Sequence, residues 1–268
     1  VLFLAAMGLV LTLPAIGDAP ARKEREPVHP VQRLLGDVRE GLVVILQDPL
    51  LVRAIGYLTL AATTFLMVAA LGPTFMTQVI GLPTEDIGYV VGPAGVGVFA
   101  GALLVTRLAR RFERSSVIDW ALTCAGIVLL LLALSKSLLN VVWIGGNAPS
   151  SLITVVTAVF AAALGVCNAF ILVPAQTMLQ ERSPEQIRAR VYATFFMISN
   201  TFSFIPIFFA AAFADLFGVV EVLVVVALLL VAIGGTSVLR RKRAELTRWE
   251  ARKMRHRQGP ETFTADDQ

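Results

Sequence analysis

Residues 152–178, with the sequence LITVVTAVFAAALGVCNAFILVPAQTM, contain no Asp, Glu, Lys, Arg or His. About 20 consecutive apolar residues in a helix are enough to cross the hydrocarbon core of a bilayer, which is about 30 Å thick. A helix of this length on a soluble protein would carry charged residues along its solvent face. The stretch therefore predicts a membrane-spanning helix, and it determines the class of fold.

The rest of the chain repeats this pattern. Of its 268 residues, 56% are hydrophobic and 16% are charged, and the mean hydropathy is +0.76. Ordinary soluble domains have about 45–50% apolar and about 25% charged residues. Five further apolar runs predict spans: 53–76, 87–108, 117–134, 191–213 and 219–239. The expected fold is an all-α membrane protein with six complete transmembrane helices.

The segments outside these runs predict four parts of the chain. Residues 1–16 form another apolar stretch, which we interpret as part of a preceding transmembrane helix; a signal peptide, with small residues at Ala19 and Ala21, is the alternative. Residues 17–49 are expected to be a cytoplasmic linker, in which apolar residues at helical spacing between Val31 and Leu46 predict an amphipathic helix. Residues 50–239 form the six-helix domain, and 240–268 form a basic, then acidic, cytoplasmic tail.

Local signals predict where two of the helices begin. Asp48 precedes Pro49, which places a helix-capping residue before proline at the first helical position. The stretch Ser183-Pro184-Glu185-Gln186 has the spacing of a capping box, with Gln three residues after Ser. We expect one span to begin at each of these signals.

The distribution of basic residues predicts the orientation of the spans. If the runs alternate in direction, 22 of the 23 Lys and Arg residues lie on one side of the membrane, and only Lys136 lies on the other. Such an excess is typical of the cytoplasmic side. Both ends of the six-helix unit are therefore expected in the cytoplasm, with the basic tail against anionic lipid headgroups and not bound to nucleic acid.

Neutral polar and aromatic residues near the centres of four spans are candidates for a substrate cavity. A side-chain amide or hydroxyl in the membrane is unfavourable unless it faces protein or water. Hydrogen bonds between neighbouring helices are the alternative for each of them. The candidates are Thr63, Thr64, Asn168, Phe196, Ser199 and Asn200.

No Asp, Glu, Lys, Arg or His lies deep in any of the six spans, which disfavours an intramembrane enzyme. Asp119 and Glu221 lie near the ends of their runs, and both histidines lie outside the runs. Cys124 and Cys167 show no spacing typical of a metal site or a disulfide framework. We expect no catalytic residue, no metal and no cofactor.

Several stretches resemble a known family. Residues 174–184 (PAQTMLQERSP), 188–193 (RARVYA) and 214–218 (ADLFG) are similar to bacterial efflux permeases of the enterobactin-exporter and macrolide-efflux type, the transmembrane secretion effector group of the major facilitator superfamily. The six runs then correspond to helices 7–12, the second half of a twelve-helix protein. Ala189 departs from the family, which usually has Gly there, and Arg110 stands where the superfamily's loop motif has an acidic residue.

The resemblance implies a function. The protein would be a secondary transporter in a bacterial inner membrane that exports a small drug, macrolide or siderophore by alternating access. It would use a coupling proton and need the missing N-terminal half. A polytopic scaffold or secretion accessory protein without transport activity is the alternative. The residues implied at the cytoplasmic gate, which otherwise simply anchor their loops inside the cell, are Arg110, Arg111, Arg114, Arg188 and Arg190.

Overall fold

The computed structural model describes residues 30–108, 113–143 and 148–257, and every regular element within them is a helix. Six of these helices are long and apolar enough to cross a membrane, which confirms the predicted fold class. The predicted partial helix 1–16 and the end of the tail, 258–268, lie outside the described residues. The elements are α2 (Pro30–Gln47), α3 (Pro49–Thr74), the π-helix η1 (Phe75–Ile80), the 3-10 helix η2 (Thr84–Ile87), α4 (Gly88–Leu108), α5 (Arg114–Ala133), α6 (Ser135–Val142), α7 (Ser150–Arg182), α8 (Arg188–Phe217) and α9 (Val219–Arg257).

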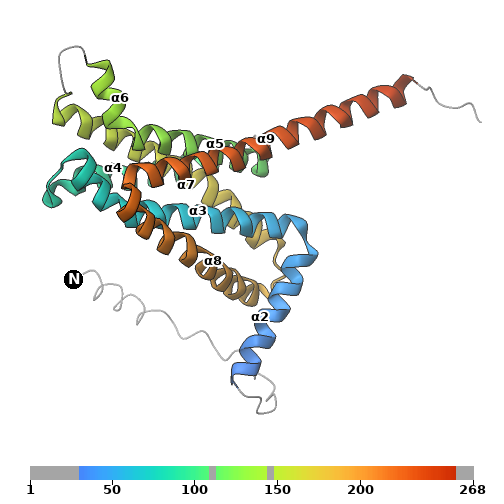
Figure 1. The fold of residues 1–268 in the computed structure, drawn as a ribbon. Coiled ribbons are helices and arrows are strands. Elements are labelled where there is room, and N and C mark those ends of the chain that lie inside the picture. Colours follow the sequence, from blue (N-terminus) through green and yellow to red (C-terminus); the bar gives the residue numbers. More distant parts are fainter. Residues whose placement is uncertain (1–29, 109–112, 144–147, 258–268) are drawn as a thin grey trace, which may run out of the picture.

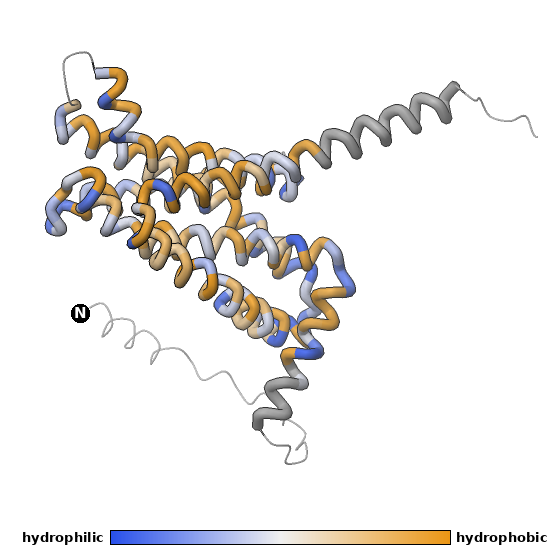
Figure 2. The backbone as a smooth tube through the Cα atoms, in the orientation of Figure 1, coloured by the Kyte–Doolittle hydropathy of each residue, from blue (hydrophilic) through white to orange (hydrophobic). Residues whose placement is uncertain are grey.

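The six spans lie side by side in one bundle, with α2 at one end and the short helix α6 at the other (Figure 1). Figure 2 shows hydrophobic residues along the length of the bundle and hydrophilic residues gathered where α2 meets it. The apolar part of the last span ends at Leu239, but α9 continues as one helix to Arg257 and projects beyond the bundle. Residues 240–257 of the predicted tail thus continue the helix of the last span.

The start of α3 confirms one of the predicted helix signals, and the start of α8 contradicts the other. The Asp48 side chain accepts a hydrogen bond from the backbone N–H of Leu50 at 2.9 Å, as expected of a cap. α8, however, begins only at Arg188. The Ser183 hydroxyl donates to the Leu179 carbonyl at 2.6 Å, so it caps the end of α7 instead of the start of α8.

Small residues let two pairs of helices approach closely. A Cβ atom on Gly97 of α4 would lie 2.0 Å from the carbonyl oxygen of Ala162 on α7, and one on Gly165 of α7 would lie 2.3 Å from that of Ala94. Gly126 of α5 and Gly234 of α9 bring those two helices together in the same way. Close contact between backbones is a main source of helix association in lipid, where the hydrophobic effect contributes little.

The amphipathic helix predicted in the linker is present as α2, and it packs against the bundle. Gly41 faces α8, where a Cβ atom would lie 2.3 Å from the hydroxyl oxygen of Thr194. Ile45 is only 3% exposed. An ion pair between Glu40 and Arg190 joins the same two helices. α2 is therefore fixed against the ends of the spans.

Candidate functional site

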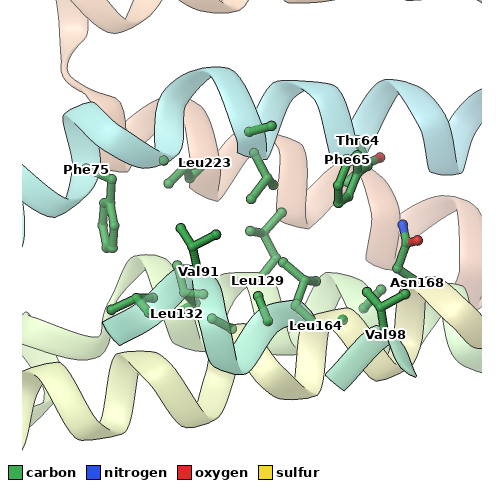
Figure 3. Close-up of a pocket in the computed structure, with 18 of the residues that line it drawn as sticks. Thr64, Phe65, Phe75, Val91, Val98, Leu129, Leu132, Leu164, Asn168 and Leu223 are labelled. Carbon is green, nitrogen blue, oxygen red and sulfur yellow. The ribbon is translucent and has the colours of Figure 1, made fainter. Parts of the chain in front are cut away.

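A cavity of about 530 Å³ lies between α3 and α4, and α5, α7 and α9 form its other walls. Its volume lies within the range of about 300–1,000 Å³ that is typical of small-molecule sites. Phe65 of α3 and Val91 of α4 line the cavity and are also more than half exposed. The cavity therefore opens at the surface between these two helices. Figure 3 shows both side chains among those that line it.

Only two of the described lining residues are polar, and they lie at the same end of the cavity. Thr64 on α3 and Asn168 on α7 lie near each other, whereas Phe75 and Leu132 lie at the opposite end (Figure 3). The Thr64 hydroxyl donates to the Leu60 carbonyl at 2.9 Å. The hydroxyl oxygen can therefore act only as an acceptor toward the cavity.

A buried acidic residue lies just beyond this polar end. Asp119 on α5 is 4% exposed, and its Oδ1 accepts a hydrogen bond from the Tyr57 hydroxyl on α3 at 2.6 Å. Ala61 and Leu122 line the cavity; Tyr57 precedes Ala61 by four residues, and Asp119 precedes Leu122 by three. Residues three or four apart lie on the same face of a helix. The Tyr57–Asp119 pair therefore lies about one helical turn beyond the cavity wall, and neither residue is part of the lining.

Reasoning from the sequence missed this pair, because Asp119 lies near the end of its apolar run. The useful signal was its helical register. A carboxyl one turn before the inward-facing Leu122 belongs on the inner face, however close the helix end is. No pattern in the sequence pointed to Tyr57, because the residue to which it donates, Asp119, lies 62 residues away in the sequence.

The other predicted cavity residues lie elsewhere on the bundle. The Thr63 hydroxyl is 2.6 Å from that of Ser203, so it links α3 to α8. Ser199 is buried on the same helix. Phe196 and Asn200 lie on the exposed face of α8, where the Asn200 amide donates to the Phe196 carbonyl at 2.9 Å. Of the six candidates, the structure brings Thr64 and Asn168 together in the cavity.

The predicted gate arginines that can be placed lie at the end of the bundle that carries α2. Arg114 of α5 pairs with Glu181 of α7, and Arg190 of α8 pairs with Glu40 of α2. Arg188 makes a long hydrogen bond, 3.4 Å, to the carbonyl of Ser183. Sequence reasoning did not select Arg182 as a gate residue, yet it lies 3.7 Å from Asp48 at the start of α3. Arg110 and Arg111 lie outside the described residues.

The opposite end of the cavity is formed by an interrupted helix. Pro73 lies near the end of α3, where its ring removes a backbone donor, and the chain continues as the π-helix η1. Gly72, Pro73, Phe75 and Met76 all line the cavity. π-helical turns are frequent at functional sites. Across this end, Lys136 of α6 donates to the carbonyl of Val79 in η1.

A membrane-spanning helical bundle that encloses an apolar cavity with a few polar groups has the architecture of a membrane transport protein. Comparison with known families identifies which kind. The family model of the major facilitator superfamily matches residues 1–205, and the chain therefore belongs to this superfamily of transporters. No curated protein and no solved structure shows a significant match to the chain.

Proposed function

We propose that the protein is a secondary active transporter that exports a small amphipathic or hydrophobic compound. The observation that carries the proposal is the cavity of about 530 Å³, with Thr64 and Asn168 at one end of otherwise apolar walls. A compound with a large apolar part and a small polar group matches this lining. Drugs, macrolides and siderophores are the candidate substrates, and a bacterial plasma membrane is the proposed location.

The exposed helix faces support a second six-helix half as partner. The most apolar window of α5 is 50% buried within the described chain, but that of α4 is only 17% buried. α8 is similarly open, and Asn200 lies on its exposed face, 12 residues from the start of a 30-residue helix. An amide at this depth is unfavourable in contact with lipid. We propose that the N-terminal half of the same protein covers these faces.

Alternating access is the proposed mechanism, with the two halves rocking about the cavity. The ion pairs Arg114–Glu181, Arg182–Asp48 and Arg190–Glu40 tie α2, α3, α5, α7 and α8 together at one end. This end would move as a unit that closes the cytoplasmic side. A proton is the proposed coupling ion, and no enzymatic step is part of the mechanism.

A scaffold without transport activity fits the structure less well. A scaffold needs no internal space, so its polar residues should be used up in contacts between helices, as Thr63 is with Ser203. Asn168 instead lines the cavity. The cavity therefore favours transport.

Replacement of Asn168 tests this function. Asn168→Leu removes one of the two polar groups from the cavity wall, and we expect it to reduce export several-fold without lowering the amount of protein in the membrane. The measurement is the accumulation of fluorescent lipophilic compounds in cells that produce the full-length protein, with and without an uncoupler. Gln176→Leu is the matched control, because Gln176 is an exposed amide on the same helix. Unchanged export by Asn168→Leu would remove Asn168 from the site.

A further inference from the structure

We propose that two glycines, Gly72 of α3 and Gly95 of α4, determine the size of the compound that the cavity accepts. This inference rests on the proposed transport function and narrows its substrate class by size. Selection would then depend on two positions of the wall that have no side chain.

The composition of the wall leaves size and shape as the main basis for selection. Thr64 and Asn168 are its polar residues, and the described lining contains no Asp, Glu, Lys, Arg or His. Most of the wall therefore offers only van der Waals contacts, which are individually weak and add up only where the ligand fits closely. A compound that is too large for such a wall gains nothing in exchange for the clash.

Three of the described lining residues are glycines, and they differ in what surrounds them. A Cβ atom on Gly165 would lie 2.3 Å from the carbonyl oxygen of Ala94, so this glycine is needed for the contact between α4 and α7. A Cβ atom on Gly72 or Gly95 would meet no atom of the described residues within 4 Å. The missing side chains at these two positions therefore leave open space, and because both positions line the cavity, that space belongs to it.

The two glycines lie at different places along the cavity. Gly95 is exposed and lies one helical turn from Val91, which is itself more than half exposed at the opening. Gly72 lies three residues before Phe75, which marks the apolar end in Figure 3. Residues three or four apart share a face of a helix. A side chain at position 95 would therefore narrow the opening between α3 and α4, and one at position 72 would shorten the apolar end.

Matched glycines on the same two helices separate this effect from a general effect of glycine replacement. Gly56 of α3 and Gly92 of α4 are exposed, and neither is among the lining residues. A Cβ atom on either would also meet no atom of the described residues within 4 Å. Leucine is favoured over glycine in a helix at all four positions. At positions 72 and 95, however, the new side chain would occupy the cavity.

Two uncharged photoreactive ligands of different size test the proposal. Benzophenone is the smaller, and 4-phenylbenzophenone has one further ring; on irradiation both insert into neighbouring C–H bonds, with those of methionine among the preferred. Uncharged ligands are used because an ion would lose its hydration without gaining a charged partner on the wall. The full-length protein in phosphatidylcholine nanodiscs is irradiated with each ligand.

The measurement is the labelled fraction of Met76, determined by mass spectrometry. Met76 lines the cavity and is only 6% exposed, so a ligand reaches it through the cavity. Met197 is 53% exposed on α8, which contributes no residue to the described lining, and its labelling serves as the internal reference. Labelling of Met76 is expressed relative to this reference.

The expected result is a loss of the larger ligand at the two lining positions. Gly72→Leu and Gly95→Leu should each lower the labelling of Met76 about tenfold for the largest ligand that the unmodified protein accepts. Gly95→Ala adds only a methyl group and should lower it less. Gly56→Leu and Gly92→Leu should leave the labelling of Met76 unchanged.

The outcomes separate this inference from the proposed function. Labelling of Met76 at the original level in either lining variant would overturn the role of that glycine, while leaving the cavity as a binding site. An equal loss in Gly92→Leu would overturn the size limit, because that side chain lies outside the cavity. Absence of Met76 labelling by both ligands in the unmodified protein would count against the cavity itself. If a leucine variant does not fold, Gly95→Ala still decides, and unchanged labelling in it contradicts the proposal.

Discussion

At the scale of single residues, burial depends on helical register more than on distance from a helix end. Asp119 lies only five residues from the start of α5, about 7.5 Å along the axis at 1.5 Å per residue. Asp119 is nevertheless only 4% exposed, because its side chain points toward α3 and accepts a hydrogen bond from Tyr57. Asn200 is the converse case, because it lies near the centre of α8 but on the exposed face. The sequence identified the polar residues but not the faces on which they lie.

Two glycines of α4 also differ in whether they face a neighbouring helix, and their replacement by alanine tests this difference. Gly97 and Gly92 both lie on α4, but a Cβ atom on Gly97 would meet the Ala162 carbonyl at 2.0 Å, whereas one on Gly92 would meet nothing within 4 Å. We expect Gly97→Ala to destabilise the protein by about 1–3 kcal/mol, because the α4 and α7 backbones must separate. Thermal unfolding in nanodiscs, followed by intrinsic fluorescence, measures the difference.

Gly92→Ala is the control for this prediction. It places the same methyl group on the same helix, where it meets no atom of the described residues within 4 Å, and alanine is favoured over glycine inside a helix by about 0.5–1 kcal/mol. The stability of this variant should stay equal or rise slightly. If both variants unfold at the same temperature, α4 and α7 do not approach each other as closely as the structure has them.

At the scale of the helices, hydropathy predicted all six spans but misplaced several of their ends. The average over many apolar residues is a strong signal for a span, whereas an end depends on a few local contacts. The capping-box pattern at Ser183 failed because the Ser183 hydroxyl bonds backward to Leu179 of α7. Nothing in the sequence reports the π-helix after Pro73, because it depends on how α3 packs at its end.

The docking of α2 is a prediction at this scale. Glu40 and Arg190 are partly exposed, so their ion pair should contribute less than about 1 kcal/mol. Glu40→Arg alone should therefore increase hydrogen exchange in α2 by no more than about fivefold, as should Arg190→Glu alone. The double reversal, Glu40→Arg with Arg190→Glu, should restore the original protection. Mass spectrometry of the α2 peptides measures the exchange.

This experiment also separates the ion pair from the packing of α2. Gly41 and Ile45 are unchanged in all three variants and hold α2 against α8. If the double reversal exchanges as fast as the single variants, the pair does not determine the position of α2. The remaining protection would then come from the apolar contacts alone.

At the scale of the whole molecule, the ion pairs lie at the same end of the bundle as the polar end of the cavity. The polar end of the cavity at Thr64 and Asn168, the Tyr57–Asp119 hydrogen bond, the three ion pairs and α2 all lie toward the same end of the bundle. The interrupted helix at Pro73 and the short helix α6 lie toward the other. A substrate that enters at the polar end and leaves past the apolar end would follow the line between these two ends. Its direction across the membrane depends on which end is cytoplasmic.

The distribution of basic residues predicts that the end with α2 is cytoplasmic, and cysteine labelling tests it. Cys124 and Cys167, together with any cysteine of the N-terminal half, are first replaced by alanine. Single cysteines are then placed at Ser137 on α6 and at Gln186 between α7 and α8, which are both exposed and lie at opposite ends of the bundle. With 22 of 23 Lys and Arg residues on the side of Gln186, that side should remain in the cytoplasm.

A membrane-impermeant maleimide should then label Ser137→Cys in intact cells, and it should label Gln186→Cys only after the membrane is permeabilised. The reverse pattern would place the ion pairs and the polar end of the cavity on the outer side of the membrane. Labelling of both positions in intact cells would show that the chain does not hold a single orientation, since each position would be reached from the same side. The expected pattern would place the polar end of the cavity, at Thr64 and Asn168, toward the cytoplasm, the side from which an exporter must take its substrate.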